Sequence, residues 1–199
     1  MAIPSSLLDR TSADLLDLFA AGKNTPGAGS AAALTGAVAG SLLQAVARYT
    51  LRAAGKGGAE ASYLERAEAL LEEARERSRL LSIAVDEDAA AFERFWRLRA
   101  RGDVQEALGP AIEVPLGIAE QCAALAEIGA ELQDHGFKAA RGEASTAFRL
   151  ALASGEAALH IVRLNLKFAG TAPWAGPHEE KLGSLDRRFG DLRKGRMPE

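Results

Sequence analysis

Residues 25–30 read TPGAGS and stand directly before a long run of small apolar residues. A helix is predicted to begin near Gly29 or Ser30, so this loop places Pro26, Gly27 and several free backbone N–H groups at a helix N-terminus, which favours a carboxylate or a phosphate. The loop lacks the lysine and the spacing of a nucleotide-binding P-loop, and no strand pattern precedes it. Two interpretations remain open: the loop binds a ligand, or it is only the start of a helix that packs tightly against its neighbours.

Carboxylates stand at two places where they could take part in chemistry. Asp86 and Asp88 interrupt an apolar stretch, and Asp88 comes four residues before Phe92, so it could face a cavity or a solvated surface. Glu143 begins a predicted helix. There it is either the acid–base carboxylate of a site or only a partner of the helix dipole.

Basic residues that could hold a carboxylate lie in the second half of the chain. Arg163 and Lys167 are four residues apart and share one helix face, which fits an anion cradle or an ordinary solvated stripe. Cys122 is the only cysteine, and the histidines have no partners at metal-ligand spacing. We therefore predict no metal site and no internal disulfide.

The elements that would position these residues are helices. The chain has 199 residues, and Ala, Leu, Glu and Arg dominate its composition while β-branched residues are few, so one all-α domain over residues 1–199 is predicted. The apolar period indicates an up-and-down bundle of five to six helices. The expected helices are a first one ending at Gly22, a second from 29 or 30 to before 55, and others over 60–100, 111–134, 141–168 and 179–194, with a short turn over 104–108.

Charge and hydropathy exclude several classes of partner. The formal net charge is −3 and the basic residues are interleaved with acidic ones, so neither nucleic acid nor an anionic membrane surface is expected as a partner. The uncharged stretch 25–47 is long enough to cross a bilayer, but it is rich in Ala and Gly and contains Gln44, which favours a helix buried in a bundle. No signal peptide is indicated, and a cytoplasmic location is predicted.

Four segments together resemble the cyclodeaminase/cyclohydrolase family, which includes the C-terminal domain of formiminotransferase-cyclodeaminase. They are TPGAGSAAALTGAVAGSLLQAVARYT from residue 25, DEDAAAFERF from 86, EVPLGIAEQC from 113 and VRLNLK from 162. The resemblance implies an all-α bundle that forms a homodimer and binds a tetrahydrofolate derivative as substrate, without a permanently bound cofactor. The implied reaction is loss of ammonia from the 5-formimino form or hydration of the 5,10-methenyl form.

The resemblance also implies roles for individual residues. Glu143 would be the catalytic carboxylate near the reacting carbon, and Asp88 would contact the substrate. The loop containing Pro26, Gly27, Gly29 and Ser30 would bind the ligand through N–H groups, and Arg141 or Arg163, with Lys167, would hold its carboxylates. Members of the family carry Asn, Ser and Asp where this chain has Phe137, Gly142 and Glu143. A non-catalytic folate binder and a structural helical dimer are therefore the alternatives to an enzyme.

Overall fold

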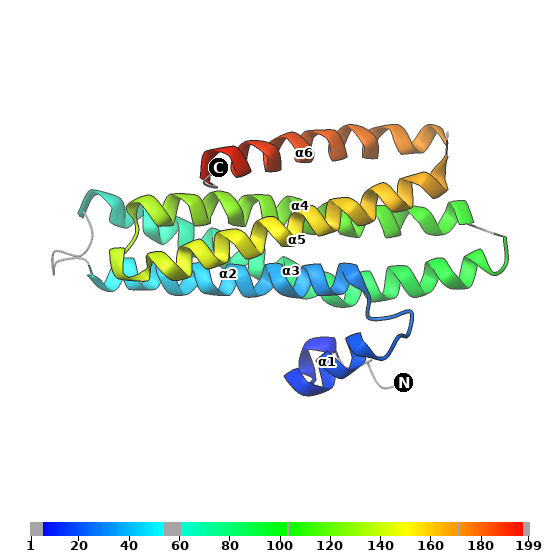
Figure 1. The fold of residues 1–199 in the computed structure, drawn as a ribbon, viewed down its shortest axis with the longest axis horizontal. Coiled ribbons are helices and arrows are strands. Elements are labelled where there is room, and N and C mark those ends of the chain that lie inside the picture. The colour runs from blue at the N-terminus through cyan, green and yellow to red at the C-terminus, as the bar shows by residue number, and fades with distance from the viewer. Residues whose placement is uncertain (1–5, 54–60, 103, 171, 197–199) are drawn as a thin grey trace.

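The computed structural model describes residues 6–53, 61–102, 104–170 and 172–196, and every regular element in these ranges is a helix (Figure 1). The six α-helices are α1 (Ser12–Ala20), α2 (Ala28–Ala53), α3 (Leu64–Arg99), α4 (Val104–His135), α5 (Arg141–Ala169) and α6 (Gly176–Arg196). Short 3-10 turns cover Leu7–Asp9, Ala61–Tyr63, Lys138–Ala140 and Pro173–Ala175. The predicted all-α class is confirmed.

Helices α2 to α5 run side by side as the bundle, while α6 covers α4 and α5 on one side and α1 lies on the other (Figure 1). The core is made mainly of leucine, isoleucine and alanine side chains that point between the four long helices. Leu43, Leu81, Leu125 and Leu159 are buried almost completely, one from each of these helices. Burial of side chains of this kind is the main source of the bundle's stability.

The small residues of α2 let its neighbours approach its backbone. A Cβ on Gly36 would lie 2.8 Å from Sγ of Cys122, and one on Gly40 would lie 2.8 Å from Cβ of Ser78. Ala32 continues this buried stripe, whereas Ala28 is exposed. By length and apolarity α2 alone among the described helices could span a membrane, yet more than half of its most apolar window is buried in the bundle. Its composition is therefore explained by packing.

Helix α4 differs from the prediction of a short turn over 104–108 followed by a new helix at 111. Gly109 and Pro110 do not end it: α4 continues from Val104 to His135 with Pro110 and Pro115 inside. Leu108, Ile112 and Leu116 recur every four residues on its buried face. Core packing on both sides of Pro110 thus outweighs the cost of a missing backbone donor.

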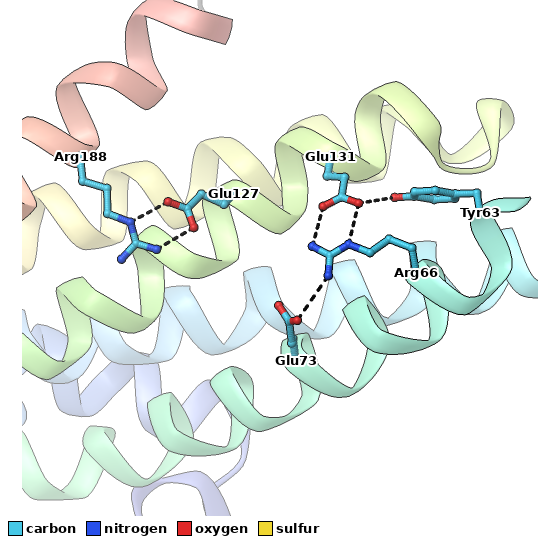
Figure 2. A network of polar contacts seen from close by, with 6 residues as sticks. All are labelled: Tyr63, Arg66, Glu73, Glu127, Glu131 and Arg188. Carbon is cyan, nitrogen blue, oxygen red and sulfur yellow. Dashed lines mark hydrogen bonds and ion pairs between the residues drawn. The ribbon is translucent and has the colours of Figure 1, made fainter.

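Charged pairs fasten the neighbours of α4 to it (Figure 2). Arg66 of α3 donates to both carboxylate oxygens of Glu131 at 2.9 and 2.8 Å, and the hydroxyl of Tyr63 lies 3.3 Å from the same group. Arg188 of α6 makes the matching bidentate contact to Glu127, with both distances 2.6 Å. The hydrogen bonds from Arg66 lower the pKa of Glu131. Each such partly exposed pair contributes about 1 kcal/mol or less.

Candidate functional site

A pocket with a volume of about 280 Å³ opens where the N-terminus of α2 meets the C-terminal halves of α3 and α5. Its walls are mostly aromatic and aliphatic, with a carboxylate, an amide and a guanidinium as the polar side chains. This is the usual character of a small-molecule site. The lining residues are Gly27, Ala28, Gly29, Asp88, Ala91, Phe92, Phe95, Trp96, Arg99, Ala111, Ile161, Leu164, Asn165 and Phe168.

Two helix faces supply most of this lining. On α3 the lining positions are 88, 91, 92, 95, 96 and 99, and on α5 they are 161, 164, 165 and 168, so each set follows the spacing of a single helix face. The aromatic rings contact one another across the pocket wall: the ring centroids of Phe92 and Trp96 are 6.0 Å apart, and those of Phe95 and Phe168 are 5.9 Å apart. These faces form an apolar slot suited to a flat ring.

Asp88 is the one carboxylate that is buried among the described residues, with 8% of its surface exposed. It reaches across to the start of α2, where Oγ of Ser30 donates to its Oδ2 at 3.1 Å. A Cβ on Gly29 would lie only 1.9 Å from Oδ1 of Asp88, so glycine is required for the carboxylate to sit there. Burial raises the pKa of Asp88, and the hydrogen bonds from Ser30 limit that rise. A buried carboxylate whose pKa is raised is a candidate for proton transfer.

Asn165 owes its position to a proline in the neighbouring helix. Pro115 has no N–H, so the carbonyl of Ala111, four residues earlier, receives no helical hydrogen bond from it. Nδ2 of Asn165 donates to this carbonyl at 2.6 Å. The amide is thereby held at the pocket wall, and a backbone acceptor that would otherwise lose its partner is satisfied.

The structure brings several of the predicted site residues together. Gly27 and Gly29 line the pocket, Ser30 is buried and bonded to Asp88, and the buried Pro26 precedes them. The prediction that the 25–30 loop begins a helix is confirmed. The solvated-face alternative for Asp88 is wrong, because its side chain is buried in the pocket wall.

Other predicted residues lie elsewhere. Arg163 forms an ion pair with Asp186 of α6, and Lys167 is exposed one turn further on the same face of α5, away from the lining positions. Arg141 and Glu143 are exposed at the opposite end of α5. Eighteen residues separate Glu143 from Ile161, which corresponds to about 27 Å along the helix. Within one chain, Glu143 therefore does not reach the pocket.

The positions at which the sequence departs from the family that it resembles also lie at that far end. Phe137 packs against the core and its N–H donates to Oγ1 of Thr50 at 2.9 Å. Gly142 is exposed, and a Cβ there would meet nothing within 4 Å. Phe137, Gly142 and Glu143 are not among the residues that line the pocket of the same chain.

The sequence-based predictions did not assign several pocket residues to the site, among them Trp96, Arg99, Asn165 and Phe168. The signal that could have found the first two is the spacing from Asp88 through Phe92 and Phe95, which places all of them on one face of α3. In the described part of the chain, no three His, Cys, Asp or Glu side chains are grouped so that they could hold a metal ion.

Comparisons with known proteins agree with this arrangement. The family model described as formiminotransferase-cyclodeaminase matches residues 11–175. The crystal structure of formiminotetrahydrofolate cyclodeaminase from Thermotoga maritima is similar, with a TM-score of 0.84 and 25% sequence identity over 94% of each chain. A search of the curated proteins gives no significant match. The structural likeness thus extends over nearly the whole length of both chains.

Proposed function

Because the chain belongs to the formiminotransferase-cyclodeaminase family, we propose that it acts on the one-carbon unit of a tetrahydrofolate, as a formiminotetrahydrofolate cyclodeaminase. The structurally similar protein from Thermotoga maritima carries that name. The observation that carries the proposal is the buried carboxylate of Asp88 in an aromatic pocket, held against the N-terminus of α2. Such a site joins a binding slot for a flat ring to a group that can move a proton.

The proposed reaction needs one proton to change place. N10 of the substrate attacks the formimino carbon on N5, and a tetrahedral carbon bonded to three nitrogens forms. N10 then loses its proton, the bond to the former imino nitrogen breaks, and that nitrogen leaves as ammonia once it has gained a proton. The protonated formimino group and N10 together give ammonia and the 5,10-methenyl cation, with no net change in protons.

Asp88 is our proposed carrier of that proton. Its carboxylate would accept the proton from N10 and deliver it to the leaving nitrogen, and a raised pKa suits a group that must do both. The same negative charge would stabilise the delocalised methenyl cation as it forms. Hydration of the methenyl cation to the 10-formyl form passes through a similar tetrahedral carbon, so cyclohydrolase activity is the alternative within the same pocket.

The experiment follows the near-ultraviolet absorbance of 5,10-methenyltetrahydrofolate. One cuvette contains 5-formiminotetrahydrofolate and the other contains the methenyl compound, each with and without protein. Appearance of the band in the first identifies a cyclodeaminase, and its accelerated loss in the second identifies a cyclohydrolase. Two flat traces with folded protein would overturn the proposal; folate binding would then indicate a non-catalytic binder, and no binding a structural dimer.

Two variants assign the chemistry. Asp88→Asn should lower kcat by a factor of about 100 or more, since general acid–base groups contribute factors of this size. Glu87→Gln is the matched control, because Glu87 is the exposed neighbour on the same helix and does not line the pocket. If Asp88→Asn kept full turnover while Glu143→Gln lost it, the catalytic role would belong to Glu143.

We further propose that the protein is a cytoplasmic homodimer that binds neither nucleic acid nor membrane. Burial of α2 within the bundle supports the absence of a membrane partner, and a single buried cysteine is compatible with a reducing compartment. Exposed apolar side chains such as Leu16, Val38 and Ile83 are available for contact with a second copy. Sedimentation at several concentrations would test the dimer.

A further inference from the structure

Arg99 lies at the edge of the pocket and is held there by two aromatic rings. Its guanidinium carbon is 5.0 Å from the ring centroid of Trp96 and 5.5 Å from that of Phe168. Both rings line the pocket, and both are substantially exposed, at 39% and 49%. Stacking of this kind holds a guanidinium in one plane and leaves its edge N–H donors free to bind an anion.

No acidic side chain of the described residues forms an ion pair with Arg99, in contrast to several arginines on the surface. Arg66, Arg163 and Arg188 are each paired with a carboxylate. Among the residues that line the pocket, Arg99 is the one cation and Asp88 the one anion. They lie on the same face of α3, eleven residues apart, which corresponds to about 16 Å along the helix axis.

The pocket therefore has a carboxylate at one end, aromatic walls between, and a guanidinium at the other end. Because the two residues are eleven positions apart on α3, the carboxylate of Asp88 does not neutralise the guanidinium of Arg99, which is exposed at the pocket wall. A ligand that fits carries a polar ring system near Asp88, a second flat ring between the aromatic side chains, and an anion near Arg99. A tetrahydrofolate, with its pteridine, benzoyl and glutamate parts, has these groups in this order.

We propose that Arg99 binds a carboxylate of the substrate's glutamate and makes the site selective for pteroylglutamates over pteroates, which lack the glutamate. This inference rests on the proposed function for the identity of the substrate. From the sequence we expected Arg163 and Lys167 to bind the carboxylates of the substrate, whereas the proposal assigns this role to Arg99 of α3. Arg163 is engaged by Asp186, and neither of the two residues lines the pocket.

The test measures KM and kcat for each of three proteins with each of two substrates. The substrates are 5-formiminotetrahydrofolate and the corresponding tetrahydropteroate without glutamate, and the proteins are the unaltered chain, Arg99→Gln and Arg97→Gln. Arg97 is the matched control, since it is an exposed arginine of the same helix that does not line the pocket. Circular dichroism melts establish that the variants fold.

For the unaltered chain and Arg97→Gln, loss of the glutamate should raise KM by about 10- to 100-fold, the usual effect of one charge-assisted hydrogen bond. For Arg99→Gln, KM for the glutamate-bearing substrate should already be raised by that factor, and removal of the glutamate should add little. The kcat values should change less than KM, because the contact is remote from the reacting carbon. Equal losses for Arg99→Gln on both substrates would overturn the inference.

A binding measurement separates failure of this inference from failure of the proposed function. Tryptophan fluorescence of the three proteins is titrated with 5-formyltetrahydrofolate and with its glutamate-free analogue, neither of which needs to react. Preference for the glutamate-bearing compound that is lost in Arg99→Gln supports the inference even where turnover is absent. Binding of both compounds with equal affinity by the unaltered chain overturns it even where turnover is present.

Discussion

At the scale of single residues, burial of the Asp88 carboxylate lowers the stability of the fold, and the same burial prepares the carboxylate for its proposed role in proton transfer. Burial raises its pKa, so its carboxylate is disfavoured in the folded state relative to the unfolded state. The contribution of Asp88 to the free energy of unfolding is thus fully present below its unfolded pKa of about 3.9 and is lost as the pH rises through its higher folded pKa. Proteins commonly accept such a cost where a site needs a perturbed group.

This linkage predicts a pH-dependent difference between the unaltered chain and Asp88→Asn. Urea unfolding at a series of pH values should show the unaltered chain losing stability relative to the variant from about pH 4 upward, until the folded pKa is passed. Glu87→Gln, which changes an exposed carboxylate, should follow the unaltered chain. Parallel stability curves for Asp88→Asn and the unaltered chain would contradict a raised pKa.

Gly29 is predicted to be replaceable only when Asp88 is shortened. In Gly29→Ala the new Cβ would lie 1.9 Å from Oδ1 of Asp88, so the carboxylate must move out of its place beside Ser30. We expect a loss of about 1–3 kcal/mol in the free energy of unfolding, typical of overpacking, together with a loss of turnover. In an Asp88→Ala background the same substitution should cost much less, and equal costs in both backgrounds would show that the two residues are not coupled.

At the scale of elements, α6 is attached to the bundle by packing that the pocket does not use. A Cβ on Gly155 of α5 would lie 2.1 Å from Cζ of Phe189, a residue of α6 that is buried. Gly155→Ala should therefore displace the ring and speed hydrogen exchange along α6, with turnover unchanged because α6 does not line the pocket.

Gly183→Ala is the control for that substitution. Gly183 lies in α6 itself, and a Cβ there would meet only the side chain of Arg187, at 3.7 Å, which is ordinary contact. Exchange along α6 should then be unchanged or slower, since alanine favours the helix. If both variants loosened α6 equally, packing of Phe189 against Gly155 would not be what attaches it.

The helices also show which parts of the fold and of the candidate site could be predicted from the sequence. Apolar periodicity predicted α2, α3, α5 and α6, and the resemblance to the cyclodeaminase/cyclohydrolase family is confirmed. The prediction that a helix ends before Pro110 was wrong. The low helix propensity of Gly109 and Pro110 is a local property, and it does not reveal that residues on both sides of Pro110 pack into the core. Asn165 could not be singled out, since its role depends on an unpaired carbonyl in another helix. Residues from α2, α3 and α5 meet only through tertiary packing.

At the scale of the whole molecule, the bundle has two ends with different chemistry. The pocket lies where α2 begins, whereas Glu143 and the replaced family positions lie where α5 begins. The catalytic role of Glu143 and the homodimer both remain predictions. Because about 27 Å of helix separates Glu143 from the pocket of its own chain, Glu143 could take part in the chemistry of such a pocket only if that pocket belonged to a second copy.

A role for Glu143 therefore predicts complementation between variants. Asp88→Asn and Glu143→Gln would each be inactive alone, but a mixed dimer would hold one site with Asp88 from one copy and Glu143 from the other. When equal amounts are unfolded and refolded together, half of the dimers are mixed and half of their sites are intact, so about a quarter of the activity should return. Full activity of Glu143→Gln alone would remove Glu143 from the reaction, and two inactive variants without recovery would exclude sites shared between copies.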